Sequence, residues 1–200
     1  MARKYGSIES GKLGDKILYT WNGRQCERSM PKSVANPRSE AQQAHRSAFA
    51  MVSRLSSQMK EAHLVGLHWD AVREENNSYG VFRRMNKDCC DGGEVDYARV
   101  VVSRGPVAPM YFAGVEVDEG GVLRVRMEGA VGSGDARDEL FVFVYCAELE
   151  VGHLVEPVRR CEGEVAVVLP EEWLGRGMHL YAFMRDRRGR TSSTSHCELL

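Results

Sequence analysis

Long apolar runs are missing from this 200-residue sequence. No stretch approaches the roughly 20 consecutive apolar residues that a membrane-spanning helix needs. The first six residues, Met1–Gly6, carry positive charge, but no apolar run follows them, so we do not expect a secretory signal. The sequence therefore predicts a cytoplasmic protein with no membrane partner.

Catalytic motifs are also scarce. Residues Gly6–Lys12 match the first seven positions of a phosphate-binding P-loop, but Leu13 stands where a Ser or Thr must reach magnesium. No Gly-x-Ser-x-Gly nucleophile motif occurs. His63 and His68 miss the i, i+4 spacing of two metal ligands on one helical face, although a metal site assembled across the fold stays an open alternative. We predict a protein that is not an enzyme, with no catalytic residue, cofactor, metal or evident small-molecule substrate.

Six cysteines are spread through the chain without any feature of a secreted protein. Reduced thiols are the default interpretation in that context. Cys89 and Cys90 are adjacent, which is too close for an ordinary disulfide. We expect the cysteines to be structural residues, because free cysteine is usually buried or half-buried.

The net charge of −1 hides an asymmetry along the chain. Residues 1–60 hold 11 Lys and Arg against 4 Asp and Glu, whereas residues 61–200 hold 16 against 24. A basic N-terminal arm can contact nucleic acid or the acidic part of a neighbouring copy. A solvated basic face without any partner is the plain alternative.

The segment from Ile17 to Met30 is typical of a β-hairpin. Ile17–Trp21 is rich in aromatic and β-branched residues, and Asn22-Gly23 is the preferred pair for a type I′ turn. Arg24–Arg28 returns as a polar strand. A two-stranded hairpin is marginal in water, so we expect it to pack on another element.

A long helix is predicted after the hairpin. Pro37 disfavours helix at the residue before it, and Ser39 followed by Gln42 forms a capping box. The predicted helix runs from Glu40 to Val65 without an internal Gly or Pro, and Gly66 is a natural stop.

Apolar residues recur along this helix at spacings of three and four. We expect the face with Ala48, Met51, Leu55 and Met59 to be buried, against the protein's own domain rather than a second copy. The next stretch is less regular: a second short helix is predicted near Trp69–Arg73, and residues 81–85 suit either helix or strand.

From Val95 onward the pattern changes to β-strand, with turn signals every 8–15 residues. About seven strands suggest an immunoglobulin-like sandwich, although the Cys…Trp…Cys pattern of true immunoglobulin domains is absent. We predict an α+β fold in which an N-terminal β-hairpin and one long α-helix (domain 1–92) precede a C-terminal antiparallel β-sandwich (domain 93–200). The predicted strands cover residues 96–103, 111–115, 122–127, 140–146, 164–169, 178–185 and 191–197.

Several short motifs span nearly the whole chain in one order. They are Gly11-Lys12-Leu13-Gly14, Trp21-Asn22-Gly23, Arg28-Ser29, Asn36-Pro37-Arg38-Ser39 with Gln42 and Arg46, Asp96-Tyr97 with Ser103-Arg104-Gly105, and Leu169-Pro170-Glu171-Glu172-Trp173 with His179–Phe183. In these motifs the chain resembles an uncharacterised family of about 200-residue proteins, a domain of unknown function found mainly in Bacteroidota. The resemblance implies no activity.

The basic arm is the candidate binding region. Its cations are interleaved with aromatic side chains that can stack on bases, although Tyr19 and Trp21 share strand parity and can instead form the packing face of the hairpin. We predict a non-enzymatic binding or structural protein that acts through protein–protein assembly, for which a phage-like or mobile element is a candidate origin. The alternative is a nucleic-acid-associated protein that uses the same arm. The predicted partner-binding residues are Arg3, Lys4, Lys12, Lys16, Tyr19, Trp21, Arg24 and Arg28.

Overall fold

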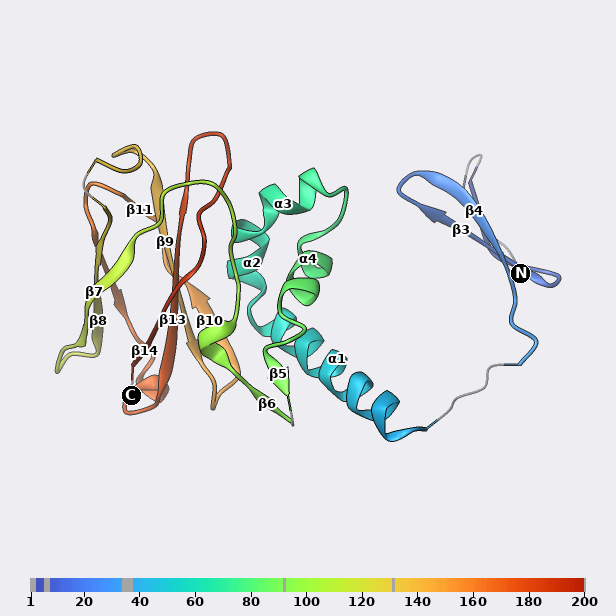
Figure 1. The fold of residues 1–200 in the computed structure, drawn as a ribbon, viewed down its shortest axis with the longest axis horizontal. Coiled ribbons are helices and arrows are strands. Elements are labelled where there is room, and N and C mark those ends of the chain that lie inside the picture. The colour runs from blue at the N-terminus through green and yellow to red at the C-terminus, as the bar shows by residue number, and fades with distance from the viewer. Residues whose placement is uncertain (1–2, 6–7, 34–37, 92, 131, 200) are drawn as a thin grey trace. The chain divides into compact units, whose positions relative to one another are not determined.

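The computed structural model describes residues 3–5, 8–33, 38–91, 93–130 and 132–199 (Figure 1). Contacts between residues divide the chain into two compact units, Met1–Gln42 and Gln43–Leu200. The division that we predicted between residues 92 and 93 stays a prediction. Each compact unit is described by itself below.

The first unit is an antiparallel sheet with the strand order β1-β2-β3-β4. Its strands are β1 (Arg3–Tyr5), β2 (Ile8–Leu13), β3 (Lys16–Trp21) and β4 (Arg24–Ser29). The predicted hairpin is confirmed as β3 and β4, and both turn residues have positive φ, 48° at Asn22 and 74° at Gly23. The two strands before it were not predicted from the sequence.

The predicted long helix begins correctly but is not continuous. Helix α1 (Glu40–Gln58) starts after Ser39, whose Oγ accepts a hydrogen bond from the backbone N–H of Gln42 at 3.4 Å. It ends before Met59, and α2 (Lys60–Gly66) follows, so the prediction of one helix from Glu40 to Val65 was wrong. We attribute the break to His63, whose Nε2 lies 2.8 Å from the Ser56 carbonyl oxygen, the acceptor that a continuous helix would use.

Two short helices and a pair of two-residue strands complete the helical region. The predicted helix near Trp69–Arg73 is confirmed as α3 (His68–Arg73), and residues 81–85 belong to α4 (Ser78–Met85). Asn77 caps α4, because its Oδ1 accepts from the backbone N–H of Gly80 at 2.8 Å. Strands β5 (Cys90–Asp91) and β6 (Glu94–Val95) pair with each other.

Two larger antiparallel sheets form the rest of the second unit. One has the order β10-β9-β13-β14 with β11 also paired to β9, and the other has the order β12-β8-β7. Their strands are β7 (Tyr111–Val117), β8 (Val122–Glu128), β9 (Glu139–Cys146), β10 (Val151–Leu154), β11 (Val158–Arg159), β12 (Glu164–Val168), β13 (Met178–Arg185) and β14 (Ser195–Leu199). The 3₁₀ turn η2 (Glu171–Trp173) lies between β12 and β13.

Strand β9 is buried on both faces. Phe141, Phe143 and Tyr145 join the core that the helices form, whereas Val142 and Val144 join the core shared with the three-stranded sheet. Alternate residues of a strand point to opposite faces, so β9 and β13 make a central layer between helices and a second sheet. Figure 1 shows this order of layers. The continuous apolar run in the sequence is thereby explained.

One predicted strand does not form. Residues 96–103 contain the 3₁₀ turn η1 (Tyr97–Arg99) followed by an extended segment that belongs to neither sheet. Side chains replace a strand partner in this segment. The Asn86 Oδ1 accepts from the Val101 backbone N–H at 2.7 Å, and the Asn86 Nδ2 donates to the Val101 carbonyl oxygen at 2.9 Å. The Thr194 Oγ1 accepts from the backbone N–H of Val102 and of Ser103. The strand-like composition of this segment therefore reflects burial rather than sheet pairing.

The predicted buried face of the long helix is confirmed only toward its C-terminal end. Leu55 and Met59 are buried, with 2% and 0% of their surface exposed, whereas Ala48 and Met51 are half-buried. Phe49 remains 56% exposed. The first half of α1 thus presents much of its surface to solvent.

Candidate functional site

The N-terminal sheet gathers most of the predicted binding residues on one face. Residues directly opposite each other on paired strands share a face, as do alternate residues along one strand. Trp21 lies opposite Arg24, and Ile17 lies opposite both Lys12 and Arg28. The side chains that follow from this register are Lys12, Tyr19, Trp21, Arg24 and Arg28, which we call the basic-aromatic face.

This sheet has no core of its own. Over residues 10–33, where the structure describes the side chains of the sheet, none is buried. Trp21 is 64% exposed and Tyr19 is 40% exposed. Sheets gain stability by covering an apolar face, and a small sheet that covers nothing needs packing from outside. The basic-aromatic face is therefore exposed in this unit, and packing from outside would stabilise it.

The remaining predicted residues are Lys16 on β3 and two residues of β1. Lys16 is on the opposite face, where its Nζ lies 2.9 Å from a carboxylate oxygen of Glu27. The hydrogen bond from this ammonium group to Glu27 raises the pKa of Lys16. Arg3 and Lys4 are on β1, opposite Ser10 and Glu9 of β2. The structure thus brings five of the eight predicted residues together and separates Lys16 from them.

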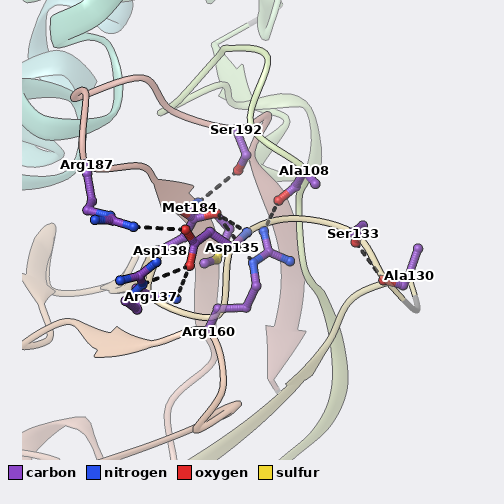
Figure 2. A network of polar contacts seen from close by, with 10 residues as sticks. All are labelled: Ala108, Ala130, Ser133, Asp135, Arg137, Asp138, Arg160, Met184, Arg187 and Ser192. Carbon is purple, nitrogen blue, oxygen red and sulfur yellow. Dashed lines mark hydrogen bonds and ion pairs between the residues drawn. The ribbon is translucent and has the colours of Figure 1, made fainter.

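A second polar cluster lies at one end of the two larger sheets (Figure 2). Asp135 accepts hydrogen bonds from the side chains of Arg137 and Arg187, at 3.3 and 3.2 Å. The backbone N–H of Arg137 and these two guanidinium groups lower the pKa of Asp135 to about 2. Arg160 is mostly buried beside Asp138, with 3.7 Å between the Nε and the carboxylate, and also donates to the Ala108 carbonyl.

This cluster was not predicted from the sequence, although an arginine-rich segment contributes to it. Four arginines fall within Arg185–Arg190, in the connection between β13 and β14. Arg185 pairs with Glu139, and Arg190 pairs with Asp186. The acids in the cluster are thereby engaged by neighbouring arginines, which is the arrangement expected of a network that fixes loops. The network explains loop geometry and indicates no reaction.

The thiols and histidines are placed as structural groups. The Cys89 and Cys90 sulfur atoms are 3.8 Å apart and both side chains are buried. Burial raises the pKa of the Cys89 thiol to about 12, so it stays protonated at neutral pH. His179 stacks on Tyr97, with ring centroids 4.3 Å apart. Within the described ranges, no group of three or more His, Cys, Asp or Glu residues is arranged to hold a metal ion.

The fold and the comparisons together define the class. The chain is a mixed α+β protein with an N-terminal sheet, four helices and several antiparallel sheets. It belongs to the family of unknown function DUF6266, which matches residues 8–196, and the resemblance drawn from the short motifs is confirmed. A comparison with curated proteins finds no match. In the part of the chain that the structure describes, no helix is both long and apolar enough to cross a bilayer.

Proposed function

We propose that this chain is a non-enzymatic protein that assembles with further copies of itself through the basic-aromatic face. The observation that carries the proposal is a four-stranded sheet with an exposed Trp21 and Tyr19 and no buried side chain over residues 10–33. Burying one large apolar side chain stabilises an association by about 1.5–3 kcal/mol. Aromatic and arginine side chains also dominate the energetics of protein interfaces.

Charge favours a second copy as the occupant of this face. Residues 1–42 carry 8 Lys and Arg against 4 Asp and Glu, for a net charge of +4. Residues 43–200 carry 19 against 24, for a net charge of −5. Unlike charges on one chain make association between copies favourable at low ionic strength, and salt weakens it.

Several finer features extend this proposal. The two larger sheets share one core, which supports an immunoglobulin-like sandwich as their architecture. A cytoplasmic location fits a chain whose cysteines are all free. A phage-like or mobile element, within Bacteroidota, is the origin that we favour for an assembly protein of this kind. Genes for capsid or tail proteins beside the coding gene would support that origin, and replication genes would argue against it.

The assembly proposal is tested by comparing the two faces of the N-terminal sheet. Trp21→Ser removes the main apolar group of the basic-aromatic face, and Leu13→Ser removes a 57% exposed apolar group of the opposite face. In size-exclusion chromatography of the full chain at low salt, we expect Trp21→Ser to shift the protein toward monomer. Leu13→Ser should elute like the parent chain. Equal behaviour of both variants and the parent would contradict the proposal.

Nucleic-acid binding is a second candidate, because three cations and two aromatic side chains share one face. Cations that track a phosphate backbone beside stacking aromatics are the usual elements of single-strand binding. If this is the function, affinity falls steeply with salt, and replacing Arg24 and Arg28 with Ala flattens that dependence. Lys16→Ala, on the opposite face, is the control. A gel-shift assay without any shift for DNA or RNA at low salt removes this candidate.

A further inference from the structure

Strand β12 is an open sheet edge. The three-stranded sheet has the order β12-β8-β7, and among the described strands β12 pairs with β8 alone. An unpaired strand edge exposes a row of backbone donors and acceptors that can pair with another chain.

The register identifies the outward-facing backbone groups. Met127 N donates to Gly163 O at 2.8 Å, and Leu169 N donates to Gly121 O at 2.9 Å. In an antiparallel pair, hydrogen-bonded and non-hydrogen-bonded positions alternate along the strand. Gly163 and Leu169, which flank β12, are both odd-numbered. The backbone groups of Val165 and Val167 therefore form hydrogen bonds with β8. The backbone groups of Glu164, Ala166 and Val168 point away from β8.

The edge carries little protection against pairing. Natural proteins block open edges with lysine, proline or bulges. The sequence of β12 is Glu-Val-Ala-Val-Val, with neither residue type, and its pairing with β8 is regular over all five residues. Val168 is 71% exposed, the most exposed large apolar side chain in the described part of the chain.

A small recess adjoins this edge. It has a volume of about 160 Å³ and lies where β12 meets β9, β10 and η2. Strand addition combines main-chain pairing with a pocket for a side chain of the incoming strand, which supplies specificity. A mostly apolar recess beside the edge therefore suits one apolar side chain. Its lining residues are Val144, His153, Val167, Leu169, Pro170 and Trp173, together with Val168.

The chain segment that forms the edge is acidic, although Arg124 and Arg126 of β8 lie opposite Ala166 and Glu164. Residues 148–172, which include β10, β11 and β12, contain seven glutamates and two arginines, for a net charge of −5. Glu148 and Glu150 are paired with Arg176 and Arg54. The other five glutamates, none of which has an ion pair among the described residues, are Glu156, Glu162, Glu164, Glu171 and Glu172.

Strand β4 has the complementary properties. Met30 N donates to Asp15 O, so Arg24, Cys26 and Arg28 bond β3, and the backbone groups of Glu27 and Ser29 point away from β3. β4 has six residues against the five of β12, and it carries two arginines and one glutamate. Side chains of neighbouring strands lie in one layer, where opposite charges attract.

We infer that the open edge of β12 accepts strand β4 of a second copy of this chain. This inference rests on the proposed function, because it names the acceptor for the N-terminal sheet. It makes the contact heterologous, since a donor edge and an acceptor edge differ. Such contacts propagate into rings or filaments.

Two variants of the full chain test the acceptor. Ala166→Pro removes an outward N–H without touching a bond to β8, because the Ala166 N–H does not point toward that strand. Val168→Lys places a charge on the open edge. We expect both to reduce the association constant at low salt at least tenfold. Val72→Lys, at a 65% exposed position on α3, is the matched control and should associate like the parent chain.

Hydrogen exchange provides a readout that does not depend on the variants. On raising the concentration of the parent chain, the amides of Ala166 and Val168 should slow at least tenfold, while those of Val165 and Val167 are protected throughout. Association that survives both variants, without added protection at Ala166 and Val168, would overturn the acceptor site but leave the proposed function standing. A chain that stays monomeric would overturn both. Protection that is independent of concentration would show that the chain covers its own edge.

Discussion

Strand β3 of the N-terminal sheet and strand β9 of the central layer both carry aromatic side chains but place them in opposite environments. Phe143 and Tyr145 of β9 are 0% and 1% exposed, whereas Trp21 and Tyr19 of β3 are 64% and 40% exposed. The aromatic side chains of β9 are buried within the second unit, whereas those of β3 are exposed in the N-terminal sheet. Composition alone therefore does not decide whether an aromatic strand is core or interface; the number of layers around it does.

The largest expected effect is a buried charge in the helical core. Leu55→Asp places a carboxylate at a position that is 2% exposed, and we expect it to lower the free energy of unfolding by about 3–5 kcal/mol. Urea denaturation followed by circular dichroism measures the change. Phe49→Asp, on the same helix but 56% exposed, should change it by less than about 1 kcal/mol. Equal effects would show that this face of α1 is not a core face.

Overpacking of the central layer should cost less. A Cβ added at Gly152 would lie 2.1 Å from Cζ of Phe143, which is too close for any real contact. We expect Gly152→Ala to destabilise the fold by about 1–3 kcal/mol, because the ring must shift. Gly177→Ala is the control, since its Cβ meets nothing nearer than 3.9 Å. A Gly152→Ala variant as stable as the parent would mean that Phe143 is loosely held.

The histidines give a pH dependence with a defined sign. Burial lowers the pKa of His63, His179 and His196 below the ordinary value of 6.5. The folded state therefore binds fewer protons than the unfolded state below that pH. We expect the free energy of unfolding to be steady above about pH 7 and to fall as the pH drops through 6.5 and below.

Chemical denaturation between pH 8 and pH 5 measures this slope. His63 is the deepest of the three, and its ring faces Ser56, Tyr79, Phe82 and the charge of Arg83. His63→Gln should make the slope shallower, because it removes the most buried of the three imidazoles. A slope that His63→Gln does not alter would assign the titration to other groups.

The smallest expected effect on stability belongs to the N-terminal sheet. Trp21→Ser should change the unfolding free energy of the second unit by less than about 0.5 kcal/mol in dilute, high-salt solution. The reason is that Trp21 belongs to the first unit and its side chain is exposed in the monomer. Thermal denaturation under those conditions measures it. A large loss would show that Trp21 contributes to folding of the monomer, and the contrast between the two regions would then be wrong.

Local signals in the sequence predicted the elements that local chemistry determines. The Asn22-Gly23 turn and the cap at Ser39 appear as expected, whereas Gly66 is the last residue of α2 and Leu67 is its C-cap. The predicted strand over residues 140–146 also forms, as β9. The turn and the cap depend on local backbone conformation, which residues nearby in the sequence determine.

Features that depend on distant residues were missed. The break at Met59 follows from a contact of His63, and the segment after η1 is held by Asn86 and Thr194, which are far away in the sequence. Strand parity, which is readable from the sequence, separates Lys16 from Tyr19 and Trp21 on β3. The grouping of Lys12, Arg24 and Arg28 with these aromatics, and the open edge at β12, required the pairing register.

Sedimentation equilibrium of the full chain, over a dilution series at low and at high salt, tests the central claim most directly. The account predicts a mean mass above that of the 22.4 kDa monomer at low salt, rising with concentration and returning to the monomer at high salt. Trp21→Ser should remain near the monomer mass throughout. A parent chain that stays monomeric at every concentration in low salt would contradict self-assembly through the N-terminal sheet.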